Sequence, residues 1–108
     1  MFFSEIIDIL NEKFGTHFTE SDQISVFDAI RAEAVADEEV VQRAHANEFE
    51  NFALAFRPKV EGLMLDRMER NQEIVTRYLN DPEFRAIVDQ ELARRTYDEI
   101  RAGENPAP

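Results

Sequence analysis

Residues that interrupt helices are nearly absent from the body of this sequence, and this limits what the chain can fold into. Gly is too flexible for a helix interior, and Pro lacks the backbone N–H that a helix needs. The 108 residues include only three Gly and four Pro, and three of these fall together at Gly103, Pro106 and Pro108. The remaining sequence therefore favours an all-α fold.

Apolar residues recur at helical spacing near the start of the chain and predict two helices. Ser4 is expected to cap the first helix, and Gly15 to end it by adopting left-handed backbone angles. Thr19 is expected to cap the second helix. The two apolar stripes consist of Phe3, Ile7, Leu10 and Phe14, and of Ile24, Phe27, Ile30 and Ala34.

The middle of the chain predicts a short helix and then a long one. Asp37 is a plausible cap for the short helix, which we expect to run through Ala44. Helical spacing then continues for some thirty residues from about Glu48 to Tyr78. Pro58 interrupts this stretch, so we expect a kink or break near Arg57. The apolar residues of the long stretch are Phe49, Phe52, Phe56, Val60, Leu63, Met64, Met68, Val75 and Tyr78.

The last helix has a specific start signal in Asp81 and Pro82, a cap followed by a residue suited to the first helical position. Its apolar stripe runs from Phe84 to Ile100. We therefore predict a compact bundle of about four to six helices with one long, Pro-kinked central helix. Residues 1–102 would form a single helical domain, and residues 103–108 a flexible C-terminal tail.

The net charge of the chain limits the kinds of partner that it can bind. The net charge is −11, and the excess of acids lies in residues 1–50, which carry −9, whereas residues 51–102 carry −1. Binding to a nucleic-acid backbone depends on Lys and Arg, so we expect no direct nucleic-acid binding by the isolated domain. We also expect no membrane span and no signal peptide, because the apolar runs are short and residues 1–10 lack a positive segment. With no Cys, a cytoplasmic protein is predicted.

Motifs for chemistry are missing from the sequence. A di-iron site in a helical bundle needs Glu-x-x-His pairs, and neither His17 nor His45 belongs to one. There is no Cys nucleophile, no Gly-framed Ser and no Gly-rich loop for a phosphate. We therefore predict no catalytic residue, no metal site and no cofactor in this segment.

The most unusual polar cluster is expected on the long helix, and it has two interpretations. Asn71 falls within the apolar stripe, so it should be partly buried and hydrogen-bonded. The cluster either ties this helix to a neighbouring carboxylate or open carbonyls, or forms part of a partner-binding surface. The phenylalanines at positions 49, 52 and 56 likewise form either core or a partner groove. The members of the polar cluster are Asp66, Arg67, Arg70, Asn71 and Arg77.

A series of short motifs between residues 8 and 101 resembles one family in the same order. The chain resembles the C-terminal helical region of the restriction (R) subunit of type I restriction-modification enzymes. Arg57-Pro58 departs from the family pattern, in which a non-Pro residue continues the helix. The motifs are Leu10-Asn11-Glu12-Lys13-Phe14-Gly15-Thr16, Phe18-Thr19, Asp22-Gln23, Ala36-Asp37-Glu38-Glu39, Ala46-Asn47, Asn51-Phe52, Asp66-Arg67-Met68-Glu69, Asn71-Gln72-Glu73-Ile74, Asp81-Pro82-Glu83-Phe84-Arg85 and Tyr97.

The resemblance implies a role in assembly. Such an R subunit joins a nuclease, an ATP-dependent DNA translocase that uses ATP and Mg, and a helical end that helps it associate with the modification and specificity subunits. Two hypotheses follow: a docking domain of such an R subunit, or a stand-alone acidic protein that mimics DNA charge and inhibits a DNA-handling enzyme. A weaker third hypothesis has the Arg-bearing second half touching DNA during translocation.

Overall fold

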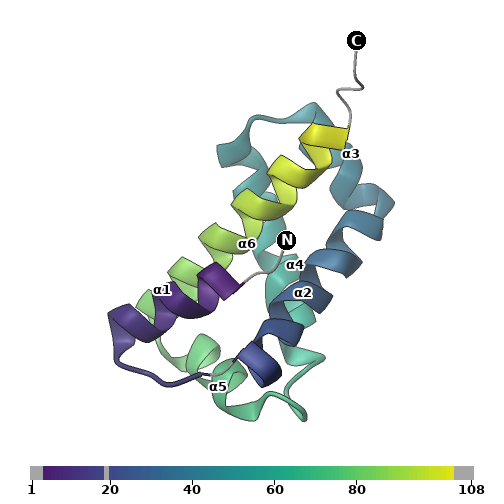
Figure 1. The fold of residues 1–108 in the computed structure, drawn as a ribbon. Coiled ribbons are helices and arrows are strands. Elements are labelled where there is room, and N and C mark those ends of the chain that lie inside the picture. The colour runs from purple at the N-terminus through teal and green to yellow at the C-terminus, as the bar shows by residue number, and fades with distance from the viewer. Residues whose placement is uncertain (1–3, 19, 104–108) are drawn as a thin grey trace.

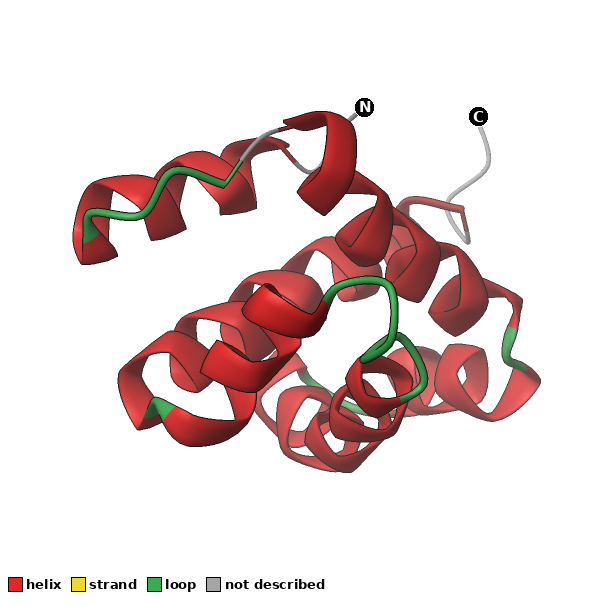
Figure 2. Ribbon diagram, turned by 90° about the horizontal axis from the view of Figure 1, so that it is seen from below, coloured by secondary structure: helices red, strands yellow, loops and turns green. Residues whose placement is uncertain are grey.

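The structure is a computed structural model that describes residues 4–18 and 20–103, without the side chains of residues 4, 5 and 20–25. All regular structure in these ranges is helical, and short loops join the helices (Figure 2). The all-α prediction is therefore confirmed. The six helices are α1 (Ser4–Phe14), α2 (Glu20–Ala36), α3 (Glu38–Ala46), α4 (Phe49–Leu65), α5 (Gln72–Asn80) and α6 (Pro82–Gly103).

Helix α6 is the centre of the bundle. It runs diagonally through the middle of Figure 1, with α1 on one side and α2 on the other, and it packs against each of the other five helices. Its 22 residues make it the longest of the described helices. Residues buried on all six helices join one hydrophobic cluster around it. The predicted stripes supply most of that cluster, including Leu10, Phe27, Phe52, Tyr78, Phe84 and Leu92.

The loop after α1 is closed by one side chain. Gly15 has φ of +66°, as predicted for the residue that ends this helix. The Asn11 amide donates to the Phe18 carbonyl and accepts from the Phe18 N–H, both at 3.0 Å, so it pairs with that backbone as a strand would. The Thr16 hydroxyl also donates to it, at 2.8 Å. The side chain of Asn11 thus fixes the path of residues 15–18.

Both predicted aspartate caps are present. Asp37 accepts from the backbone N–H groups of Glu39 and Val40 at 3.0 and 3.4 Å. Asp81 accepts from those of Glu83 and Phe84 at 3.1 and 3.3 Å. Each carboxylate satisfies donors that a helix start leaves open. The predicted roles of Phe3, Ser4, Thr19 and Ile24 lie outside the described residues and side chains.

The prediction of one long helix from Glu48 to Tyr78 is wrong, and of the kink or break predicted near Arg57 the break does not occur. Helix α4 continues through Pro58 to Leu65, and the chain turns at residues 66–71 before α5. At this turn the N–H groups of Arg67 and Met68 bond to carbonyls three residues back, which tightens and ends the helix. Met68 still packs against the core from within the turn. The apolar pattern of the sequence therefore extends beyond the end of the helix.

Candidate partner-binding surfaces

Arg67 ties the end of α4 to α2. Its guanidinium donates to the Leu63 carbonyl at 3.1 Å and pairs with Glu33 at 2.7 Å. The planar fork of Arg suits two acceptors in different directions. For Arg67, the packing interpretation of the sequence is therefore confirmed: it holds a neighbouring carboxylate and an open carbonyl.

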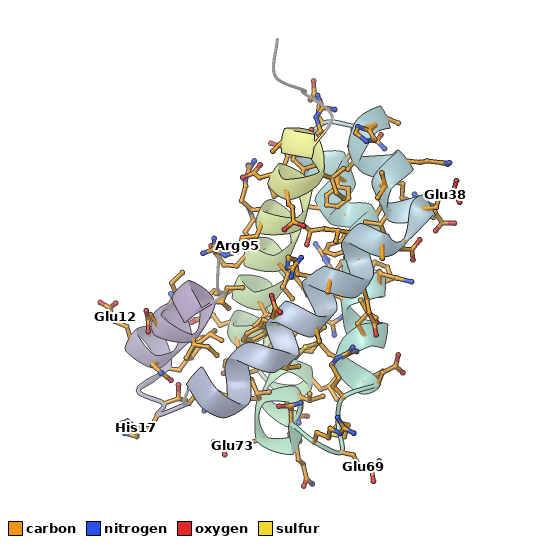
Figure 3. All side chains as sticks on the ribbon, turned by 45° about the vertical axis from the view of Figure 1, so that its right-hand side comes forward. Glu12, His17, Glu38, Glu69, Glu73 and Arg95 are labelled. Atoms are coloured by element: carbon orange, nitrogen blue, oxygen red, sulfur yellow. The ribbon has the colours of Figure 1, made fainter. Side chains whose placement is uncertain are left out.

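Three other members of the predicted cluster lie beside Arg67. Asn71 is half-buried, as predicted, but it precedes α5 and does not lie within a long helix, and its side chain makes no capping hydrogen bond. The reason is the turn at residues 66–71, which separates it from α4. Asp66 and Arg70 are exposed, and all four residues line a hollow of about 500 Å³ against α2. Figure 3 shows Glu69 at the outer edge of the same turn.

Arg77 lies away from the turn at residues 66–71, and its side chain packs against α1. Its guanidinium stacks over the rings of Phe14 and Phe84, at 5.2 and 5.6 Å from their centroids. The Arg77 guanidinium also lies 3.9 Å from the Asp81 carboxylate. Because Phe14 is on α1 and Phe84 on α6, Arg77 holds these two helices together rather than contributing to the turn surface.

A polar network that the sequence interpretation missed joins α4, α5 and α6. The Tyr78 hydroxyl donates to Asp89 at 2.6 Å, and Arg85 contacts both Asp89, at 3.6 Å, and Glu61. Burial raises the pKa of Asp89 above its usual range, and burial together with the Asp89 hydrogen bond raises that of Tyr78. The i to i+4 spacing of Arg85 and Asp89 was the available signal.

A groove runs along the outer seam between α4 and α6. Glu61 meets Arg85 at one end and Phe49 meets Arg94 at the other, so the helices are antiparallel. The guanidinium of Arg94 lies 3.6 Å from the centroid of the Phe49 ring. Two hollows of about 320 and 500 Å³ follow the seam and share three lining residues. The shared residues are Ala53, Arg57 and Gln90.

The three phenylalanines of α4 divide between the two interpretations. Phe52 and Phe56 are buried and their rings stack at 5.1 Å, so they belong to the core. Phe49 is only partly buried and closes one end of the groove, with its ring 5.6 Å from that of Tyr97. Leu54, one turn further along α4, is 62% exposed and Leu65 is 46% exposed. They are the exposed large hydrophobic residues of the described part of the chain.

Basic residues in the second half of the chain form ion pairs with acidic residues in the first half. Lys59 on α4 pairs with Asp37 at 2.7 Å, which holds the pKa of that carboxyl below its usual range. Arg67 also forms an ion pair with Glu33, at 2.7 Å. Figure 3 shows other acids, such as Glu12 and Glu38, at the periphery of the molecule. Ion pairs within the bundle thus neutralise part of the excess negative charge of residues 1–50.

Nothing in the described ranges gathers three potential metal ligands, and His17 and His45 are both exposed. No helix in these ranges has the length and apolar character needed to cross a bilayer. Comparisons with protein-family models, with curated proteins and with solved structures find no match to the chain. In the part of the chain that the structure describes, two surfaces stand out as candidates for a partner: the turn at residues 66–71 and the α4–α6 groove.

Proposed function

We propose that this chain is a non-catalytic docking domain of the kind found at the C-terminal end of the R subunit of type I restriction-modification enzymes. It would join the rest of that subunit, an ATP-dependent translocase and endonuclease, to the modification and specificity subunits. The complex would work in the cytoplasm. ATP and Mg would be bound by the rest of the R subunit and not by this domain.

The observation that carries the proposal is the position of the residues that resemble the family. Asn11, Gly15, Asp37 and Asp81 are at helix boundaries, where they cap helices or fix a loop. Tyr97 donates from α6 to the carbonyl of Asn47 at the end of α3, at 3.0 Å. Residues of this kind specify a fold and not a reaction, so the resemblance supports a shared bundle.

An exposed leucine at the groove supports a role in contact. Leu54 and Leu65 both lie on α4, and each leaves a large apolar side chain in water. A partner that covers an apolar residue beside a groove removes its surface from water, and this stabilises the complex. Single exposed leucines are common on protein surfaces, so the weight rests on Leu54, which lines the groove, whereas Leu65 lies outside it.

The test is assembly. The 108-residue chain is mixed with a purified complex of modification and specificity subunits and passed over a size-exclusion column. We expect co-elution, and we expect an R subunit without this region to assemble poorly. If the chain elutes alone and the shortened R subunit assembles normally, the proposed function is wrong.

The acidic surface of α2 and α3 favours the second candidate, inhibition by mimicry of DNA charge. The ion pairs of Asp37 and Glu33 reduce the free negative charge on those helices, so we prefer docking. A mimic would inhibit a restriction or repair enzyme in trans, and the inhibition would fade steeply with salt. Binding through an apolar surface should weaken much less over the same range of salt concentration.

A further inference from the structure

The α4–α6 groove has the shape of a seat for a helix. Its lining includes Ala53 and Ala86, whose small side chains allow another backbone to come close. Leu54 forms an apolar wall on the α4 side. From Pro82 to Arg94 the α6 side spans thirteen residues, or roughly 18 Å at the rise of an α-helix. This length accommodates about three helical turns.

The charge of the groove is unusual for so acidic a chain. Arg57 lines both hollows and is exposed, and its charge acts on Asp89 in the same groove, but it forms no hydrogen bond or close ion pair with any described residue. Arg94 lies at the far end over Phe49, and among the described residues its only carboxylate contact is to Asp98 at 3.4 Å. Arg85 is already engaged by Glu61 and Asp89. Arg57 is therefore the cation that an incoming carboxylate would meet.

We propose that the α4–α6 groove seats an amphipathic helix of a partner protein. This helix places an apolar side chain on Leu54 and a carboxylate on Arg57. The inference rests on the proposed docking function and identifies the face that docks. It assigns the turn at residues 66–71 to packing, since Arg67 there is already held by α2 and α4.

Other occupants fit the groove less well. A nucleic-acid backbone needs several free cations in a row, whereas here Glu50 and Asp89 alternate with the arginines. A helix needs one suitable charge and an apolar contact, which Arg57 and Leu54 provide. A second copy of this chain would have to bring one of its own carboxylates to Arg57. Crosslinking distinguishes nucleic acid and a second copy of the chain from a partner helix.

The experiment uses two matched pairs of exposed residues in the full chain. Leu54→Ser and Arg57→Glu alter the groove, whereas Leu65→Ser and Arg70→Glu make the same changes beside the turn at residues 66–71. Binding to the modification–specificity core is measured by titration calorimetry, and melting temperatures confirm that each variant folds. We expect each groove variant to weaken binding by about tenfold or more, and each control by less than about threefold.

A photo-crosslinking residue at position 54 identifies the occupant. We expect it to link to a helical segment of the core that carries an Asp or Glu, and reversal of that acid to Arg should restore binding by Arg57→Glu. Links to DNA, or to a second copy of the chain, would overturn the inference. So would groove variants that bind like wild type while the wild-type chain binds the core. If the wild-type chain does not bind the core, the proposed function itself fails and the inference falls with it.

Discussion

Thr96 offers a direct test of the core packing. It lies on α6, is 0% exposed and is the one buried polar residue among those described. Its hydroxyl oxygen has no hydrogen-bond partner. A hydroxyl taken out of water without a partner costs free energy, whereas a methyl group in the same place costs none. Thr96→Val keeps the branched shape of the side chain and removes the unsatisfied group.

The expected gain follows from the desolvation of one hydroxyl. An unsatisfied buried group of this kind costs about 1–3 kcal/mol, and we take about 1 kcal/mol as the gain for Thr96→Val. The entropy of unfolding is about 2.1 cal/mol/K per residue, or roughly 0.2 kcal/mol/K for a chain of this size. The melting temperature should therefore rise by about 4–5 °C.

The assay is unfolding by heat and by urea, followed by circular dichroism. Thr96→Ser is the matched control, because it keeps the hydroxyl and removes the buried methyl group. That variant should lose about 1 kcal/mol. The urea m-value should stay constant in both variants, which would show that stability and not compactness changed. A Thr96→Val protein that melts at or below the wild-type temperature would refute the reasoning.

Further substitutions test the backbone, a cap and a buried acid. Gly15 and Gly62 both have open space where a Cβ would go, but only Gly15 has a positive φ. Gly15→Ala should therefore lose about 1 kcal/mol and Gly62→Ala, inside α4, gain about 0.5–1 kcal/mol in urea unfolding, and the same sign for both would contradict this explanation. Asp81→Ala should lose about 1 kcal/mol with its two capping hydrogen bonds, whereas Asp81→Asn should stay within a few tenths of wild type in the same assay. Burial raises the pKa of Asp89 from its usual 3.8, so the folded state holds this proton more tightly and loses stability as the pH rises above that value. Asp89→Asn should accordingly gain stability relative to wild type as the pH rises above about 4, and a difference in melting temperature that does not change with pH would exclude the effect.

The features that could be predicted from the sequence are those with local causes. Asp37 and Asp81 act on backbone groups two and three residues away, so their capping follows from position alone. Gly15 ends α1 because a left-handed residue is needed there. The apolar stripes are periodic within each helix, and they placed Leu10, Phe27 and similar residues in the core correctly.

The features that could not be predicted depend on contacts between distant segments. The turn at residues 66–71 interrupts an apolar pattern that Met68 continues by packing from outside a helix. Arg67 could be singled out by its place beside a stripe, but its partner Glu33 is 34 residues away. Arg77 shared the same stretch of sequence, yet it stacks on rings from α1 and α6. The groove was hidden for the same reason, since α4 and α6 meet only in the folded bundle.

The central place of α6 has a consequence for synthesis. Because α6 packs against each of the other five helices and is the last of the six described helices, the core that they share cannot form before α6 has left the ribosome. Until then the apolar faces of α1 to α5 lack their common neighbour. Premature termination ahead of Pro82 should therefore release a chain that aggregates or is degraded, and not a smaller working bundle.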